Sequence, residues 1–308
     1  MIKLNTLSLI GNTPLVKLER LTDDFLNLYA KLEFFQPGGS VKDRAAYQII
    51  KDAYASKRLK KGQLVVEMTS GNTGAGLAVV CQQFSNPFIA VMSRGNSPER
   101  AKIIKALGGK ILLTDQVNGK PGKVTGKDIE HASKVAKEYA EANKGFYVDQ
   151  FNNPSGVKAH FKTTGPEIWF DLPEIDAFTA SIGTGGTFMG ISKFLKSKNS
   201  RIKCIAVEPA NAAILKTGKV INPRHIIQGT GYSLIPPQWD RTLADEIMTV
   251  SDSEVFEMTR RICSEQGLYV GYSSGANVAA ALKYAKIHQE IKNIVTILCD
   301  TGYKYSNL

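Results

Sequence analysis

The sequence predicts an α/β protein built on largely parallel β-sheets with helices on their faces. Two observations lead to this prediction: short runs of apolar and β-branched residues alternate with longer amphipathic segments, and glycine-rich turns join several of these pairs. The 308 residues, 43% of them hydrophobic, are enough for one large or two medium domains, each with its own core.

The alternation of strand and helix extends through most of the chain. The expected strands are LVVEM at 64–68, FIAVM at 88–92, FTASI at 178–182 and KCIAV at 203–207. The expected helices cover 74–84, 97–108, 127–144 and 188–198, with another beginning near Ser40. Strands that alternate with helices in this way are typical of βα units, in which consecutive strands lie parallel.

The domain boundary is inferred from turn signals, because the chain has no long linker. Residues 114–128, rich in glycine and lysine, are expected to form a surface excursion within one domain, since a polar helix resumes directly afterwards. Residues 149–156, DQFNNPSG, contain Asn-Pro and Ser-Gly turn pairs and are the predicted junction. We therefore predict a smaller domain over 39–150 and a larger domain formed by 1–38 and 151–308.

The composition argues against several classes of function. The net charge is +11, but the basic residues are spread along the chain without a nucleic-acid-binding motif, so we expect attraction of small anions and no nucleic-acid partner. No stretch approaches the roughly 20 apolar residues that cross a bilayer, and the start lacks a signal-peptide pattern, which predicts a cytoplasmic protein without membrane contact. The cysteines lack CxxC spacing, which predicts neither a metal site nor disulfides.

Lys42 occupies an unusual position in the segment QPGGSVKDRAAYQIIKDA. If a helix begins near Ser40, Lys42 shares a face with Ala46, Ile49 and Ala53, and also with Ala45. That face is expected to be buried. A lysine aimed inward directly after a Pro-Gly-Gly turn is a candidate reactive amine, although alone it could also extend its ammonium group along an apolar face to solvent.

Two glycine-rich loops separate an expected strand from an expected helix. The first, TSGNTG at 69–74, offers free backbone N–H groups that favour a carboxylate or a phosphate. The second, GTGGT at 183–187, combines glycines that permit close backbone approach with two threonine hydroxyls, which suits a phosphate. Each loop alone could be only a tight connection between strand and helix.

The common nucleotide motifs do not fit the second loop. A dinucleotide fingerprint that starts at Gly183 needs glycine where Phe188 stands. A P-loop that starts at Gly185 reaches Gly190 but continues with Ile191, where the phosphate-binding lysine belongs. The sequence therefore supports neither NAD nor ATP.

A phosphate cradle, a carboxylate cradle and a buried amine together meet the needs of pyridoxal 5'-phosphate acting on an amino acid. The aldehyde of this cofactor condenses with a lysine amine, its phosphate needs an anion site, and the substrate brings a carboxylate. Burial disfavours the charged ammonium group, so the pKa of Lys42 is expected to be lowered and a neutral amine to be available.

At this point the chain resembles a known family. The motifs QPGGSVKDR, TSGNTG, DQFNNP, GTGGT and GYSSGA resemble, in order and spacing, those of the cysteine synthase and cystathionine β-synthase family of pyridoxal phosphate enzymes. The resemblance extends from IGNTPLVKL near residue 10 to DTGYKY near the C-terminus. It implies two three-layer α/β domains of the tryptophan synthase β-like type (fold type II), the smaller one mobile.

The resemblance also implies a role for each matching residue. Lys42 is expected to link covalently to the cofactor and then to move the Cα proton, and Asn72 to bind the cofactor's 3'-oxygen. The remaining assignments are the substrate carboxylate for Thr69, Ser70, Asn72, Thr73 and Gln150; the phosphate for Gly183, Thr184, Gly185, Gly186 and Thr187; and the pyridine nitrogen for Ser273. A neutral serine there weakens the electron sink and favours prompt loss of a group from Cβ.

Single residues from this set also have simpler interpretations. Ser273 and Ser274 precede a helical run and could cap it, and Gln150 could be a turn residue. The five motifs together favour the site over these interpretations.

The implied chemistry is β-replacement on an amino acid, and the substrate is open. The leading hypothesis is formation of L-cysteine from O-acetyl-L-serine and sulfide. The loop GTGYSLIP at 229–236 departs from that pattern, because Tyr232 resembles cystathionine synthases while Ser233 replaces their aspartate. The alternative is therefore a reaction that consumes cysteine, releases hydrogen sulfide and gives lanthionine or cystathionine.

The resemblance implies a homodimer, and the tail of a serine acetyltransferase as a further partner. A hypothesis from another class is a non-catalytic relative that binds the C-terminal tail of a partner in the carboxylate pocket. It predicts that the protein lacks the absorbance of a lysine-linked cofactor.

Overall fold

The computed structural model describes residues 3–23, 25–120, 124–232 and 234–305. The chain divides into two compact units, one formed by Met1–Ile10 and Gln36–Gly156, the other by Gly11–Phe35 and Val157–Leu308. The sequence-based division assigns residues 3–10, 36–38 and 151–156 to the larger domain, whereas here they fall in the smaller unit. For residues 3–10 the difference is the larger one. The reason is packing, because Leu7 and Ile10 contact the apolar core of that unit.

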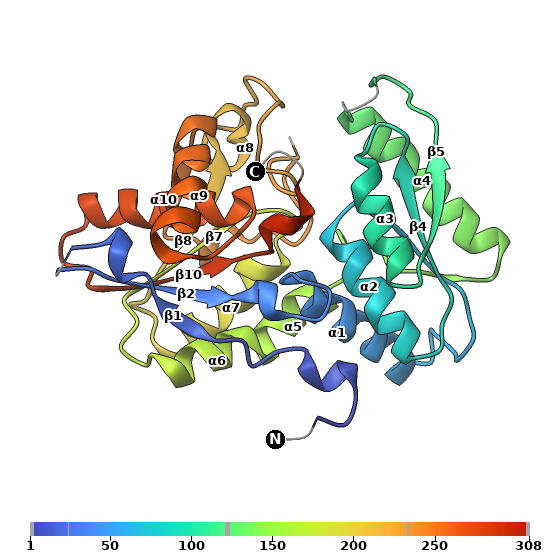
Figure 1. Cartoon of the computed structure of the whole chain (residues 1–308), viewed down its shortest axis with the longest axis horizontal. Helices are drawn as coiled ribbons and strands as arrows, with labels where there is room; N and C mark the ends of the chain where they lie inside the picture. Colours follow the sequence, from blue (N-terminus) through green and yellow to red (C-terminus); the bar gives the residue numbers. More distant parts are fainter. Residues whose placement is uncertain (1–2, 24, 121–123, 233, 306–308) are drawn as a thin grey trace. The chain divides into compact units, whose positions relative to one another are not determined.

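The smaller unit is a parallel sheet with helices on both faces, in the strand order β5-β4-β3-β6 (Figure 1). Val65 and Phe88 face a core shared with the first three helices, whereas Val66 and Val91 face α4. The elements are η1 (Thr6–Leu9), α1 (Lys42–Ala55), β3 (Val65–Met68), α2 (Asn72–Gln83), β4 (Phe88–Ser93), α3 (Pro98–Ala106), β5 (Lys110–Thr114), α4 (Gly126–Ala142) and β6 (Phe146–Tyr147).

The predicted surface excursion joins β5 to α4, and residues 121–123 lie outside the described residues. The Asp128 carboxylate accepts hydrogen bonds from the backbone N–H groups of Val117, Asn118 and Thr125, and Thr125 caps α4 in return. Burial acts to raise the pKa of Asp128, but these hydrogen bonds outweigh it and hold the pKa well below its usual range. The carboxylate therefore anchors the excursion to the start of α4.

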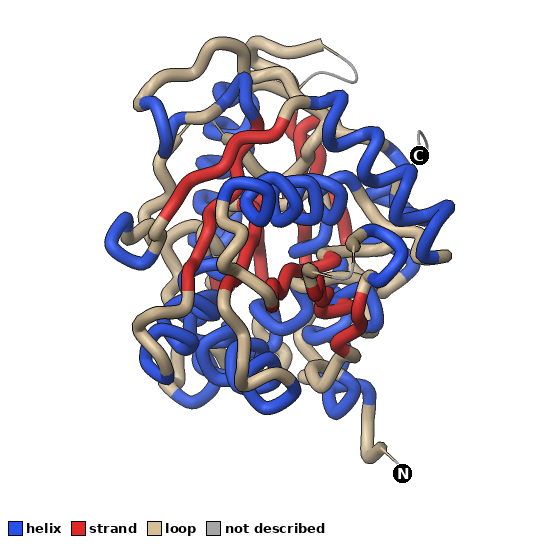
Figure 2. Tube along the Cα trace, turned by 90° about the vertical axis from the view of Figure 1, so that its left-hand side faces the viewer, coloured by secondary structure: helices blue, strands red, loops and turns tan. Residues whose placement is uncertain are grey.

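The larger unit has the strand order β1-β2-β10-β7-β8-β9, parallel except for the antiparallel pair β1-β2. Figure 2 shows these strands (red) among the helices (blue) that cover them. The elements are β1 (Leu15–Lys17), η2 (Glu19–Leu21), β2 (Asn27–Leu32), η3 (Glu33–Phe35), α5 (Ser155–Lys162), α6 (Thr164–Asp171), β7 (Ala177–Ser181), α7 (Gly186–Lys198), β8 (Lys203–Pro209), η4 (Ala210–Ala212), α8 (Ile214–Thr217), η5 (Arg241–Leu243), β9 (Glu246–Val250), α9 (Asp252–Gln266), α10 (Tyr272–Ile287), β10 (Asn293–Leu298) and η6 (Gly302–Lys304).

A main core of the larger unit lies between the sheet and the helices α9 and α10. It brings together Leu28 and Ile294 from neighbouring strands with Val255 of α9 and Val278 of α10. In Figure 1, α9 and α10 lie above the strands, and α6 lies below them. The predicted α/β class, with largely parallel sheets and helices on their faces, is confirmed.

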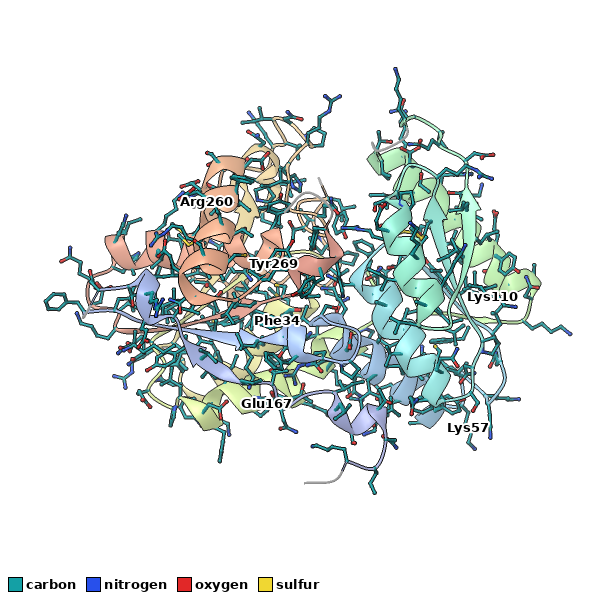
Figure 3. The ribbon with its side chains drawn as sticks, viewed as in Figure 1. Phe34, Lys57, Lys110, Glu167, Arg260 and Tyr269 are labelled. Carbon is teal, nitrogen blue, oxygen red and sulfur yellow. The ribbon has the colours of Figure 1, made fainter. Side chains whose placement is uncertain are left out.

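A cluster of polar contacts around the buried Lys31 fixes β2 against α6 in this unit. Lys31 is 1% exposed, and its Nζ lies 2.7 Å from the Thr13 carbonyl oxygen, 3.1 Å from Glu167 Oε2 and 3.3 Å from Asp171 Oδ2. Glu167 is labelled in Figure 3.

In the part of the chain that the structure describes, no helix is long and apolar enough to cross a membrane.

Candidate active site

Lys42 is the first residue of α1 and is partly buried. Its backbone N–H donates to Ser40 Oγ at 3.4 Å. The predicted apolar face is confirmed for Ala46, Ile49 and Ala53, which are at most 2% exposed, whereas Ala45 and Lys42 itself are only partly covered. Lys42 therefore lies at the partly exposed N-terminal end of a buried helix face.

The Pro-Gly-Gly turn before Lys42 is folded around Asp43, a buried acid that the sequence did not single out. The Gly38 N–H donates to the Asp43 carboxylate, and a Cβ on Gly38 would lie only 2.6 Å from Asp43 Oδ1. Gly39 has a φ of 71°, which glycine adopts without strain. From the other side, a Cβ on Gly76 of α2 would lie 3.1 Å from Asp43 Cα. These close approaches fix the position at which α1 begins.

The loop after β3 is capped by its own threonine. Thr69 Oγ1 accepts the backbone N–H of Gly74 at 3.1 Å and that of Gly71 at 3.5 Å. Gly71 is the N-cap residue of α2, so the first turn of this helix presents N–H groups toward an anion. The Ser70 carbonyl oxygen accepts from Arg100 Nη1 of α3 at 3.5 Å, which adds a cation beside the loop.

Gln150 lies against this loop, although 77 positions separate it from Thr73. Thr73 Oγ1 donates to Gln150 Oε1 at 2.7 Å, and Gln150 Nε2 donates to the Met68 carbonyl oxygen at 3.2 Å. Both threonines of the loop are buried, at 5% exposed for Thr69 and 6% for Thr73. The smaller unit thus brings together most of the side chains predicted to hold a carboxylate.

The second glycine loop connects β7 to α7 in the larger unit. Gly185 is the N-cap residue of α7 with a φ of 91°, and no described side chain caps this helix. A Cβ on Gly183 would lie 2.4 Å from the Gly229 carbonyl oxygen, so only glycine fits there. Thr187, in the first turn, lies with its Oγ1 3.2 Å from His160 Nε2.

Comparison with known proteins adds to this geometry. The model of the family described as pyridoxal-phosphate dependent enzyme matches residues 6–300. The chain belongs to this family. A cysteine synthase from Staphylococcus aureus (strain Mu50 / ATCC 700699) is 40% identical over 304 residues, which cover 98% of this chain and 94% of that protein.

Solved structures of similar enzymes agree with the family. An O-ureido-L-serine synthase has a TM-score of 0.92 and 36% identity, over 100% of this chain and 95% of that one. A hydrogen sulfide-producing enzyme from Fusobacterium nucleatum has a TM-score of 0.91 and 37% identity, over 99% and 98%. The predicted resemblance, the enzymatic nature of the chain and its pyridoxal phosphate cofactor are confirmed.

The residues of this pyridoxal-phosphate dependent enzyme fit the phosphate of the cofactor. Gly183 has no side chain to shield the backbone, and no described side chain caps the first turn of α7. An anion can therefore approach the backbone N–H groups of this loop closely. The threonine hydroxyls of the loop add donors, and the side chain of Thr187 is held by His160. His160 is buried and also lies 2.9 Å, through Nδ1, from Thr164 Oγ1. No local pattern in the sequence indicates a role for His160.

Ser273 is the second residue of α10 and is 8% exposed. The interpretation of Ser273 and Ser274 as N-caps is wrong, because Gly271 is the N-cap residue and no described side chain caps the helix. Ser274 Oγ instead accepts the backbone N–H of Cys299 at 2.9 Å, which ties α10 to the residue after β10. A helix start without a side-chain cap leaves Ser273 available for another partner.

In the 229–236 loop, which is predicted to select the substrate, Tyr232 is partly buried, and Ser233 lies outside the described residues. His225 Nε2 lies 3.2 Å from the Gly231 carbonyl oxygen, and Thr230 Oγ1 donates to the Ile227 carbonyl oxygen at 3.1 Å. Lys42, the 69–73 loop and Gln150 belong to the smaller unit. The 183–187 loop, Tyr232 and Ser273 belong to the larger unit.

Proposed function

We propose that this enzyme catalyses β-replacement and forms L-cysteine and acetate from O-acetyl-L-serine and sulfide. The observation that carries the proposal is the cradle formed by Thr69, Thr73 and Gln150 in the same unit as Lys42. It supplies donors for an amino-acid carboxylate close in sequence and fold to an amine. The name of the relative from Staphylococcus aureus, cysteine synthase, supports the choice of reaction.

In the smaller unit, the proposed roles belong to the substrate and to proton transfer. The donors proposed for the substrate carboxylate are Thr69, Ser70, Asn72, Thr73 and Gln150, with Asn72 also reaching the cofactor's 3'-oxygen. Lys42 supplies the amine that holds the cofactor covalently at rest. During reaction Lys42 takes the proton from Cα, acetate leaves from Cβ, sulfide adds at Cβ, and Lys42 returns a proton to Cα.

In the larger unit, the proposed roles belong to the cofactor. The loop Gly183, Thr184, Gly185, Gly186 and Thr187 holds the phosphate, and Ser273 meets the pyridine nitrogen. When bound, pyridoxal phosphate withdraws electrons from Cα of the substrate. Tyr232 and Ser233 are proposed to border the group that leaves or adds at Cβ.

The reaction is tested by steady-state rates with two sets of substrates. One assay follows cysteine formation from O-acetyl-L-serine and sulfide, and the other follows sulfide release from L-cysteine alone. We expect the first rate to be the higher at saturation. Faster release of sulfide from cysteine would reverse this ranking.

A second candidate is the reaction that consumes cysteine and releases hydrogen sulfide. Two observations favour it: the similarity to the hydrogen sulfide-producing enzyme from Fusobacterium nucleatum, and Tyr232 in the 229–236 loop. With a second thiol present, it predicts a thioether product, lanthionine or cystathionine, which mass spectrometry identifies directly.

Replacing Thr73 with valine is expected to raise the KM for O-acetyl-L-serine by about 10- to 100-fold, because a hydrogen bond to a charged carboxylate contributes about 1.5–3 kcal/mol. The KM for sulfide should stay within about twofold. Valine keeps the shape of the side chain but loses the hydroxyl that donates to Gln150. Thr73→Ser, which keeps the hydroxyl, is the control, and an unchanged KM in Thr73→Val would remove Thr73 from the carboxylate cradle.

We further propose that the protein is a cytoplasmic homodimer and that it binds a serine acetyltransferase tail, as the resemblance implies. Light scattering tests the dimer, and cell fractionation tests the location. Calorimetry with a peptide of that tail tests whether the tail binds, and the control is a peptide that lacks the C-terminal carboxylate.

A further inference from the structure

Glu67 is a carboxyl group inside the core of the smaller unit. It lies on β3, next to Ala90 of β4 in register, and is 1% exposed. Val65, two residues earlier and therefore on the same face of the strand, packs in the apolar core beside α1 and α2. Glu67 Oε2 has no hydrogen-bond partner among the residues that the structure describes. A carboxyl group that is buried in this way costs free energy and cannot contribute to the solubility of the protein, so another role must account for it.

The polar surroundings of Glu67 come from the segment that carries Gln150. Its carboxyl group interacts with the backbone N–H groups of Gln150 and Asp149 and with the side-chain amide of Gln150. That amide donates to the Met68 carbonyl oxygen and accepts the Thr73 hydroxyl. Glu67 is therefore joined to the carboxylate cradle through one side chain.

We propose that Glu67 is a positioning residue of the carboxylate cradle, which orients the Gln150 amide beside Thr73 and links its own protonation to binding of the substrate carboxylate. The inference rests on the proposed function, because it needs the cradle to bind an amino acid. Glu67 itself does not touch the substrate. It acts through Gln150.

The charged groups around Glu67 set the direction of this linkage. Burial raises the pKa of Glu67 to about 8, and the Asp149 carboxylate adds to the rise, while the amides of Gln150 and Asp149 oppose it. Burial is the main cause that raises the pKa of Tyr147 to about 12, and the nearby Glu67 carboxyl group is the second. The phenol of Tyr147 therefore stays neutral. On the other elements of this core, α2 carries Cys81, whose thiol stays neutral because burial raises its pKa to about 12. Helix α1 carries the buried Asp43 and Arg44, and α3 carries Arg100, whose Nη1 donates to the Ser70 carbonyl oxygen.

Glu67 is therefore neutral at pH 7 and ionises as the pH rises through about 8. A neutral carboxyl group leaves the cradle without an opposing negative charge. An ionised one repels the incoming carboxylate and also holds the Gln150 amide more strongly, since a hydrogen bond to a charged acceptor is the stronger. Substrate binding and the proton on Glu67 thus favour each other, and affinity falls above pH 8.

The test compares the cofactor-loaded wild type with Glu67→Gln, which keeps the shape and is neutral at every pH. The dissociation constant of L-alanine, an amino acid without a leaving group, is measured by calorimetry from pH 6.5 to 9.5. The ratio of the wild-type constant to that of Glu67→Gln cancels titrations that both proteins share. We expect this ratio to be constant below pH 7 and to rise about tenfold by pH 9.5, which corresponds to a Glu67 pKa of about 8 in the free protein that substrate binding raises by about one unit. A ratio that is constant across the whole range would overturn the proposal.

A second variant separates orientation from charge. Glu67→Ala removes the group beside Gln150 and should weaken L-alanine binding at least about fivefold at pH 7, whereas Glu67→Gln should stay within about twofold. If Glu67→Ala does not fold, the pH profile of Glu67→Gln decides alone. Cysteine formation by the same wild-type preparation separates the two claims: binding of L-alanine with a flat ratio contradicts only the role of Glu67, and binding with a rising ratio but without cysteine formation contradicts only the proposed reaction.

Discussion

Replacing Lys42 with alanine is expected to reduce cysteine formation at least about 10³-fold, because the variant loses both the amine that holds the cofactor and the group that moves the Cα proton. The fold should tolerate the change. Lys42 is only partly buried at the first position of α1, where the buried contacts come from Ala46, Ile49 and Ala53. We expect the free energy of unfolding of the cofactor-free variant to stay within about 0.5 kcal/mol of that of the cofactor-free wild type. Saturating rates and urea unfolding measure the two effects.

Lys51→Ala is the matched control, since Lys51 lies on the same helix but is exposed, with its Nζ 5.8 Å from the centre of the Tyr47 ring. It removes one positive charge from α1 without touching the proposed chemistry. The rate of Lys51→Ala should equal that of the wild type. Equal losses in both variants would assign the effect to the charge of the helix, and full activity in Lys42→Ala would exclude Lys42 as the reactive amine.

The repeating part of the fold could be predicted from the sequence because its causes are local. The runs at 64–68, 88–92, 178–182 and 203–207 form β3, β4, β7 and β8. Each of these strands, and each glycine turn that follows one, is determined by residues that are consecutive in the sequence. The strand β6, with Phe146 and Tyr147 alone, is too short to show a period. The antiparallel edge strand β1 has the same difficulty.

The buried ionisable side chains could not be predicted, because their partners are distant in the sequence. Lys31 and Glu67 each stand inside a strand, where a charged residue normally indicates the exposed face. Lys31 is buried because α6 brings Glu167 and Asp171 to it across more than 130 positions. Glu67 is buried beside residues that follow β6. Only the folded chain shows that these two ionisable side chains point inward.

The candidate site is predicted by motifs whose order is specific, not by local chemistry. Nothing near Gln150 in the sequence indicates that Thr73 donates to it, yet the DQFNNP motif of the resembling family marks the residue. His160 lies outside the five motifs, so the motifs do not indicate it. Its side chain is placed by α5 and reaches Thr187 of α7, so its role depends on how closely these two helices pack.

Gly190 controls that packing. It lies on α7, where a Cβ would stand 2.4 Å from the Val157 carbonyl oxygen, 2.7 Å from His160 Cβ and 2.9 Å from the Phe161 backbone nitrogen, all on α5. Backbone atoms cannot turn aside as the end of a flexible side chain can, so a methyl group must push the helices apart. Gly190, which matches one position of the P-loop pattern, is therefore explained by the close contact between α5 and α7.

Replacing Gly190 with alanine is consequently expected to lower the free energy of unfolding by about 2–3 kcal/mol through overpacking. The separation of α5 from α7 should also break the contact between His160 and Thr187, and we expect affinity for pyridoxal phosphate to fall about tenfold, the size of one hydrogen bond. Urea unfolding of the loaded protein and a spectroscopic titration with the cofactor measure the two losses.

Gly156→Ala provides the matched comparison, because Gly156 lies on α5 itself and no described atom is within 4 Å of the added Cβ. Alanine in an uncrowded helix restricts the unfolded chain, so this variant should be about 0.5–1 kcal/mol more stable than the wild type with unchanged cofactor affinity. The same substitution should therefore act in opposite directions on neighbouring helices. Equal stabilities of the two variants would show that α5 and α7 adjust freely, and the phosphate loop would then not depend on their contact.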